Sequence, residues 1–181
     1  MVRKPGRRKK KPSARSATVG DSLEPVRIGK EKAEELFRRQ GIGIENGEKI
    51  EIHPLEAVYL MERGKLALEN ETMDSLMEKV RKEDPLAGEK YAVFRHMRKN
   101  GYIARLSFSS EPWIRIYRKG FRPGEDRTQW LLRIVGSGWH PALEELISDM
   151  KKAADARKEL VYAVVEAGKP LFFKLGRTSF D

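Results

Sequence analysis

The residues best suited to chemistry lie between Trp113 and Val135. Alternating side chains predict a strand that ends at Tyr117, and an apolar run predicts a second strand from Trp130. Arg127 stands at the start of that second strand, ahead of its apolar run. Cationic residues crowd the whole stretch with few acids beside them: Arg115, Arg118, Lys119, Arg122, Arg127 and Arg133 against Glu125 and Asp126. Such a cluster is suited to hold the phosphates of a polyanionic partner.

Side chains that bind metals or transfer protons near neutral pH are scarce. The chain has no cysteine, which excludes thiolate zinc sites, and only three histidines, His53, His96 and His140. Neither His96 nor His140 has a nucleophile or a carboxylate at a recognisable spacing. We interpret His96 as a packed or solvated residue beside a helix face, and His140 as a neutral cap at a helix start. We therefore expect no metal and no cofactor.

Positive charge is concentrated at the N-terminus. The first 20 residues hold eight Lys and Arg residues and no acid, which leaves only +2 of the net charge of +10 for the rest of the 181-residue chain. With few large apolar side chains, residues 1–22 are predicted to be a disordered basic arm. The arm either contacts RNA or DNA phosphates or acts as a solubilising tail.

Residues 23–85 are predicted to form a small N-terminal mixed α/β domain. A short strand at 26–28 should precede a helix at 30–39, and Asn46-Gly47 is a strong hairpin signal. Pro54 suits the first position of a second helix, and Thr72 suits the N-cap of a third. The third helix is expected to bury its apolar side chains, Met73, Leu76, Met77 and Val80.

Residues 86–181 are predicted to form a second α/β domain with a central mixed sheet. A helix that ends at Asn100-Gly101 should lead into a strand over 102–108. After the two strands of the opening stretch, Pro141 should begin a helix with apolar positions at Leu143, Leu146, Ile147, Met150 and Ala154. The apolar run 160–165 predicts a strand buried on both faces, and 170–175 a last strand. The fold class is α/β throughout.

No segment is long and apolar enough to cross a bilayer, and no signal peptide is evident. We expect a cytoplasmic protein that has no membrane partner.

Several motifs in order along the chain resemble the archaeal tRNA-splicing endonuclease family. Residues 53–66 (HPLEAVYLMERGKL) resemble its N-terminal helix signature, and residues 91–103 (YAVFRHMRKNGYI) resemble the start of its nuclease domain. Ile116-Tyr117, TQWLL at 128–132 and ARKELVYAVV at 156–165 follow in the family's order. The resemblance covers nearly everything after residue 25 and implies a nuclease-like C-terminal domain.

This resemblance implies metal-free cleavage of intron-bearing precursor tRNA at bulge-helix-bulge sites, which leaves a 2′,3′-cyclic phosphate. The family assigns the chemistry to a tyrosine, a histidine and a lysine. Tyr117 and Lys158 match the first and third, but the histidine position falls at or beside Arg127. Arginine stays protonated and cannot act as the general acid, so the triad is degenerate. Tyr117 and Lys158 are then either functional or structural remnants.

The resemblance also implies how RNA and partner chains bind. Arg115, Arg118, Lys119, Arg122 and Arg127 are candidate RNA contacts, and Lys151 stands where the family has a base-stacking arginine. Family chains pair through the last strand and dock an acidic loop before it. Here these features fall on Leu171, Phe172 and Phe173, and on Glu166. Alternatively, the apolar strand is ordinary core.

The missing histidine favours a structural, non-catalytic subunit that assembles with a homologous catalytic subunit as an α2β2 heterotetramer. Two other hypotheses stay open. The chain could cut RNA itself with Tyr117, Lys158 and a different acid, or it could be a basic RNA-binding module led by its N-terminal arm.

Overall fold

The N-terminal region consists of three helices and a short hairpin. The computed structural model describes residues 23–120 and 128–178, so the predicted arm lies outside the described residues. Helix α1, Lys30–Gln40, ends at Gly41, whose φ of 59° allows the left-handed C-cap. Strands β1, Ile44–Asn46, and β2, Lys49–Glu51, form the predicted hairpin, with Gly47 at φ 61°. The strand expected at 26–28 is a single bridge between Val26 and Ile52.

Side-chain caps determine where the next two helices begin. Helix α2, Pro54–Glu62, follows His53, whose Nδ1 accepts from the Leu55 N–H at 3.1 Å. Helix α3, Met73–Glu83, has the predicted Thr72 N-cap. The expectation that Met73 is core was wrong, because it lies at the first turn, 39% exposed, while Leu76 and Val80 face inward.

The C-terminal region is a five-stranded mixed sheet in the order β3-β4-β5-β6-β7. Only the central β5–β6 pair is parallel. The strands β4 and β5 have the bounds predicted from the sequence pattern. The bounds of the region's elements are, in chain order, α4 Ala87–Lys99, β3 Ile103–Leu106, β4 Trp113–Tyr117, β5 Trp130–Val135, α5 Leu143–Asp155, β6 Glu159–Glu166 and β7 Lys169–Leu175.

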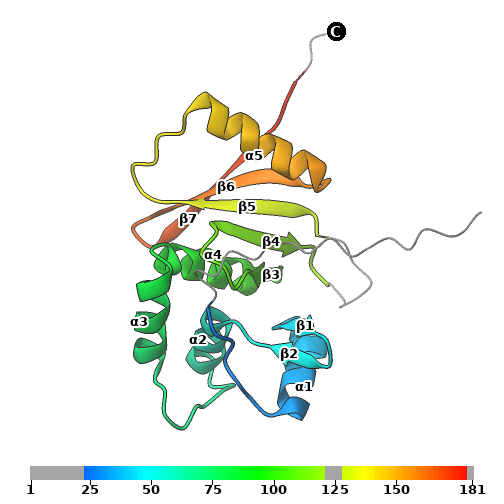
Figure 1. Cartoon of the computed structure of the whole chain (residues 1–181), viewed down its shortest axis with the longest axis vertical. Helices are drawn as coiled ribbons and strands as arrows, with labels where there is room; N and C mark the ends of the chain where they lie inside the picture. The colour runs from blue at the N-terminus through cyan, green and yellow to red at the C-terminus, as the bar shows by residue number, and fades with distance from the viewer. Residues whose placement is uncertain (1–22, 121–127, 179–181) are drawn as a thin grey trace, which may run out of the picture.

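One helix covers each face of this sheet: α5 lies on one side and α4 on the other (Figure 1). Helix α5 starts at Leu143 after an Ala142 N-cap, later than the predicted Pro141. Its inward face carries Leu146, Met150 and Ala153, which belong to the apolar cluster between α5 and the sheet. The other apolar positions of the predicted helix, Leu143, Ile147 and Ala154, are exposed.

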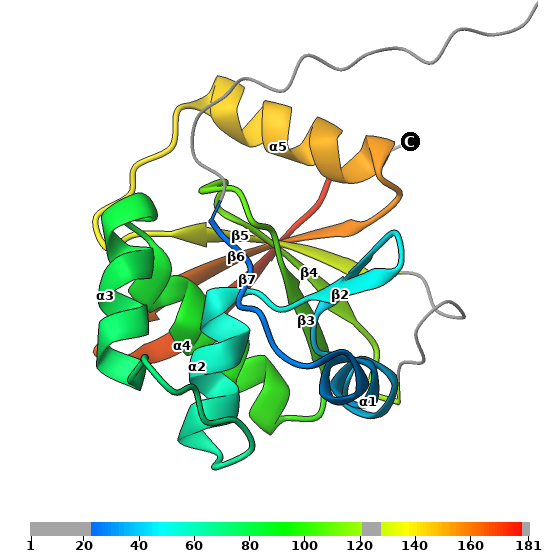
Figure 2. The ribbon, with the colours of Figure 1, turned by 60° about the horizontal axis from the view of Figure 1, so that its bottom comes forward.

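A single apolar core joins the N-terminal helices to the α4 face of the sheet. Residues of α2, α3 and α4 and of the inner strands belong to one buried cluster, while a smaller cluster lies under α5. The hairpin and α1 sit beside the β3–β4 edge, away from α3 (Figure 2). None of the described helices is long and apolar enough to span a membrane.

Candidate functional site

A cavity of about 620 Å³ lies on the α5 face of the sheet, between the N-terminal hairpin and the C-terminal end of α5. Its described wall carries four cationic side chains, one carboxylate and several aromatic rings. The lining residues are Ile44, Arg105, Leu106, Ser107, Phe108, Ser109, Glu111, Trp113, Arg115, Tyr117, Thr128, Leu131, Lys152, Ala156 and Lys158. The predicted Tyr117 and Lys158 therefore share one cavity, although 41 positions separate them in the chain.

Strand β4 presents Trp113, Arg115 and Tyr117 to the cavity because side chains alternate across a strand. The intervening Ile114 and Ile116 point to the opposite face and are fully buried there. This apolar anchor holds the strand, so that Tyr117 stands half-buried at its end.

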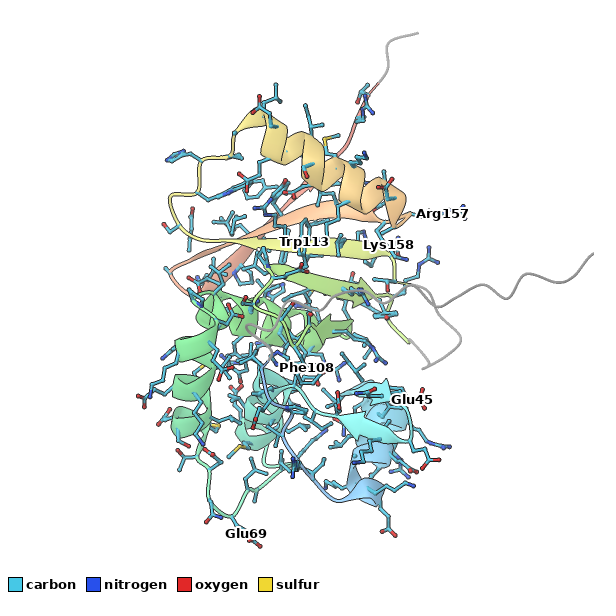
Figure 3. The ribbon with its side chains drawn as sticks, in the orientation of Figure 1. Glu45, Glu69, Phe108, Trp113, Arg157 and Lys158 are labelled. Atoms are coloured by element: carbon cyan, nitrogen blue, oxygen red, sulfur yellow. The ribbon has the colours of Figure 1, made fainter. Side chains whose placement is uncertain are left out.

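Lys158 enters the cavity because the chain turns sharply after α5. Arg157 has a φ of 55°, and its N–H bonds the Ala154 carbonyl at 2.8 Å. The Lys158 N–H bonds the Ala153 carbonyl at 2.9 Å, which completes a Schellman-type helix end. Figure 3 shows Lys158 near the C-terminal end of α5, with Trp113 closer to the middle of the sheet.

Two further cations complete the cavity wall. The Lys152 Nζ lies 4.6 Å from the centre of the Trp113 ring and 3.8 Å from the Glu111 carboxylate. Arg105 lies on the N-terminal side, with its guanidinium 5.6 Å from the Tyr117 ring centre. Both cations lie within cation–π distance of an aromatic ring.

Arg105 also ties the hairpin to the sheet. Its Nη1 donates to the Gly43 carbonyl at 3.0 Å, and its guanidinium lies 5.2 Å from the Phe37 ring centre on α1. The N–H of Gly43 donates to Glu56 Oε2 at 3.1 Å. Burial raises the pKa of the Glu56 carboxyl to about 7, although hydrogen bonds from the His53 and Gly43 amides and the nearby Arg98 and Arg105 charges oppose the rise.

Arg133, counted in the basic cluster, belongs to the packing of α5 instead. Its guanidinium contacts the carboxylates of Glu145 and Asp149 on α5, and the Tyr162 hydroxyl donates to Asp149 Oδ2 at 2.8 Å. Its charge is already neutralised, so Arg133 is not available to a phosphate.

The remaining predicted RNA contacts are spread over the surface. Arg115 lines the cavity, and the Arg118 Nε donates to Gln129 Oε1 at 2.7 Å beside it. Lys119 lies on the α4 face of the sheet, where its Nζ is 5.0 Å from the Tyr102 ring centre. Lys151 is exposed on α5 and does not line the cavity. Arg122 and Arg127 lie outside the described residues.

The predicted partner contacts separate onto two faces. Leu171 and Phe173 on β7 are 43% and 56% exposed. Phe172 points to the other side, with its ring centre 5.4 Å from that of His96 on α4. Glu166 is exposed at the β6–β7 turn.

None of the three histidines, all of which lie in the described part of the chain, lines the cavity. His53 is buried, and burial, together with the nearby Lys90 charge, lowers its pKa to about 3. His96 faces the α4 side of the sheet. His140 is exposed, and the capping role expected for it was wrong, because α5 starts at Leu143 and its N-cap is Ala142, with no side-chain cap hydrogen bond. Within 23–120 and 128–178, no group of three His, Asp or Glu residues is placed to hold a metal ion.

Sequence analysis did not identify Arg105, Trp113 or Lys152 as cavity residues. Trp113 could have been found, since it shares the strand face of Arg115 and Tyr117. Arg105 and Lys152 carried no local signal, because only the fold brings β3 and α5 to the same cavity.

Comparisons with known proteins find matches to both regions of the chain. A family model described as tRNA intron endonuclease, N-terminal domain, matches residues 22–78, and one described as tRNA intron endonuclease, catalytic C-terminal domain, matches residues 88–171. A tRNA-splicing endonuclease of Thermococcus onnurineus is 30% identical over 158 residues, which cover 83% of this chain and 90% of the relative. One from Pyrococcus furiosus is 29% identical over 157 residues, with the same shares. One from Methanothermobacter thermautotrophicus is 28% identical over 135 residues, 71% of this chain and 76% of the relative.

Proposed function

Because this chain belongs to the tRNA intron endonuclease family, we propose that it is a structural subunit of a tRNA-splicing endonuclease. In this role it assembles with a homologous catalytic subunit, as an α2β2 complex that cuts introns from precursor tRNA. The chain itself supplies little or no catalysis.

The observation that carries this proposal is a cavity with a tyrosine and a lysine and no histidine. Tyr117 and Lys158 line it, whereas His53, His96 and His140 all lie elsewhere. Cleavage to a cyclic phosphate requires a proton for the leaving 5′-oxygen, and arginine at position 127 cannot give one up near neutral pH. Loss of a general acid costs roughly 10²- to 10⁴-fold in rate.

The cations of the cavity support a remaining role in RNA binding. Arg105, Arg115, Lys152 and Lys158 outnumber the one carboxylate, Glu111, in the described wall. A subunit of this kind can hold substrate phosphates while the partner's site does the chemistry.

The far edge of the sheet supports assembly. Strand β7 is the last strand of the order, and its outer backbone edge has no neighbouring strand among the described residues. Leu171 and Phe173 are exposed. Phe173 pairs with Tyr162, which packs under α5, so Phe173 and Leu171 lie on the α5 side of β7. Leu143 and Ile147 are exposed on α5 itself. An exposed strand edge beside apolar side chains is suited to pair with another chain.

Cleavage assays test the proposal directly. The purified chain alone should leave a precursor tRNA with a bulge-helix-bulge intron uncut, and the complex purified from the native cell through a tag on this chain should cut it. Tyr117→Phe in this chain should change the rate of the complex less than about threefold, because the chemistry belongs to the partner. Efficient cutting by the chain alone would overturn the structural role.

The second candidate is an active nuclease, favoured by the shared placement of Tyr117 and Lys158 in one cavity. Under that hypothesis Tyr117→Phe would lower the rate by at least tenfold. Arg127→His is a further test. The complex should cut precursor tRNA without this substitution. Cleavage by the Arg127→His chain alone would show that Tyr117 and Lys158 can act once a histidine is supplied.

A further inference from the structure

A second pocket, of about 380 Å³, lies on the opposite face of the sheet, between α4 and the ends of β4 and β5. Its floor is aliphatic and comes from three adjacent strands, Ile116 on β4, Leu132 on β5 and Val161 on β6. Aromatic rings surround this floor. No residue proposed for RNA cleavage lines the pocket.

Two of the rings stand at right angles. The centres of Tyr102 and Trp130 are 5.9 Å apart with an interplanar angle of 83°, so they form a corner above the floor. The Trp130 Nε1 donates to Glu159 Oε2 at 2.8 Å, which holds the indole in place. Both residues are partly exposed and line the pocket.

A cation is positioned at the same corner. The Lys119 Nζ lies 5.0 Å from the Tyr102 ring centre. Its aliphatic stem passes Gly101, where an added Cβ would lie 3.8 Å from Lys119 Cδ. Within the described part of the chain, Lys119 makes no ion pair with an acidic residue. Its charge is therefore available to an anion beside the aromatic corner.

Asn100 adds a polar group to the rim. Asn100 lines the pocket, and its Nδ2 donates to the His96 carbonyl at 2.9 Å, which orients the amide. Aromatic rings, an amide and a cation are together the groups that recognise a nucleotide. The base stacks on a ring, the edge of the base forms hydrogen bonds with the amide, and the phosphate pairs with the cation.

We propose that this pocket binds one unpaired nucleotide of single-stranded RNA, with its base against Tyr102 and Trp130 and its phosphate at Lys119. An apolar side chain of a partner protein would fill the aliphatic floor but would leave the Lys119 charge unused. The lysine therefore favours a nucleotide.

The position of the pocket relates it to the cavity that holds Tyr117. Ile116 lies in the pocket floor and Tyr117 lines the cavity, so consecutive residues of β4 face the two sites from opposite sides of the sheet. A strand of RNA that passes this end of β4 can occupy both. The inference requires only that the chain meets RNA, and it holds for a structural subunit and for an active nuclease alike.

Fluorescence of Trp130 tests the proposal on the full-length chain. In a Trp113→Phe, Trp139→Phe variant, Trp130 is the only tryptophan. Titration with a single-stranded oligoadenylate RNA should quench its emission saturably. Tyr102→Leu and Lys119→Ala in that background should each weaken the affinity between about fivefold and a hundredfold. Lys82→Ala, on the exposed surface of α3, is the matched control and should leave it unchanged.

Binding of a nucleotide and of its sugar phosphate alone distinguishes base recognition from a plain cation site. Adenosine monophosphate should quench Trp130 and ribose 5-phosphate should not; equal binding of the two would mean a plain cation site and would overturn the proposal. Quenching only by an added partner protein, with none by RNA, would also overturn it. Because the reporter variant could fold poorly, photocrosslinking of 4-thiouridine-containing RNA to the wild-type chain is the second measurement, and a crosslink map that omits residues 100–102 and 130 would count against the pocket.

Discussion

Glu56 shows at the scale of one residue how the N-terminal region supports the cavity. Its Oε2 accepts from the amides of His53 and Gly43, each at 3.1 Å, while Oε1 is buried without a hydrogen-bond partner. On the other side of Gly43, the carbonyl accepts from Arg105, which lies against Tyr117. A carboxyl group with one bare oxygen is stabilised by a proton, consistent with a pKa of about 7.

Glu56→Gln is expected to change how stability depends on pH. The folded-state pKa of about 7 lies above the ordinary 4.5, so the unfolded chain loses its proton first. Wild-type stability from this group is therefore full below pH 4.5 and falls as the pH rises towards 7. Glutamine does not ionise, so the variant should gain on the wild type by up to about 1.4 kcal/mol per pH unit in that window.

Urea unfolding at pH 5, 6, 7 and 8 measures this difference. The lowered pKa of His53 acts in the opposite direction below pH 6.5, but it is common to both proteins and cancels in the comparison. A stability difference that is constant from pH 5 to pH 8 would show that Glu56 is ionised in the folded chain at all of these values.

At the scale of elements, a buried ion pair joins α3, α4 and the segment after β3. The Lys90 Nζ on α4 lies 2.5 Å from Asp84 Oδ2 at the end of α3, and the two side chains are 4% and 1% exposed. The same ammonium donates to the Ser110 carbonyl at 3.2 Å. Asp84 Oδ1 accepts from the Leu86 N–H, so both partners are anchored by further bonds.

Lys90→Met is expected to destabilise the fold by about 3–5 kcal/mol, because it leaves the Asp84 charge buried without its partner. Thermal or urea unfolding measures this loss. Lys82→Met on the same layer of helices is the control: its side chain is 71% exposed beside Glu78, and it should cost less than about 0.5 kcal/mol. Similar losses from the two substitutions would contradict the buried-pair account.

The β6–β7 turn carries a residue that its backbone does not favour. Ala167 and Gly168 have φ of 47° and 75°, as a two-residue type I′ hairpin requires. Ala167→Asn should stabilise the chain by about 0.5 kcal/mol and raise the Tm by roughly 1–2 °C, since asparagine tolerates the left-handed conformation better.

The same substitution at Ala154, exposed within α5, should act with the opposite sign because asparagine is a poorer helix former. Scanning calorimetry on both variants separates the two effects. A loss of stability at both positions would argue against a strained turn.

At the scale of the whole molecule, four of the five exposed large apolar side chains of the described chain lie on two elements at one end. Leu143 and Ile147 belong to α5, and Leu171 and Phe173 to β7. The fifth, Met73, is isolated on α3. Four exposed apolar side chains on two elements are consistent with the proposed assembly surface, whereas a single exposed apolar residue needs no explanation.

Phe173→Lys should separate this chain from its partner without unfolding it, because the side chain is 56% exposed and the change places a charge in the proposed interface. Native mass spectrometry of the complex purified through a tag on this chain should detect the mass of the partner with the wild type. It should detect only the mass of this chain with the variant. Met73→Lys is the matched control and should retain it. An unchanged complex mass for Phe173→Lys would place the interface elsewhere.

Local signals in the sequence determined most of the elements. Alternation predicted β4, an apolar run predicted β5, Asn46-Gly47 predicted the hairpin, and Pro54 and Thr72 predicted two helix starts. Each of these features depends on the conformational preferences of a few neighbouring residues, so it can be recognised without the fold. The absence of a histidine between His96 and His140 is likewise a property of the sequence alone.

Tertiary structure decided what the elements face. Leu143 and Ile147 have the spacing of an apolar helix face, yet both are exposed. The side of α5 that faces the sheet instead carries Glu145 and Asp149, which form ion pairs with Arg133. Contacts between distant segments likewise placed Arg105 and Lys152 in the cavity that Tyr117 lines and assigned Phe172 to the α4 side. Such contacts depend on packing across the whole chain, and the sequence pattern of any one element does not contain that information.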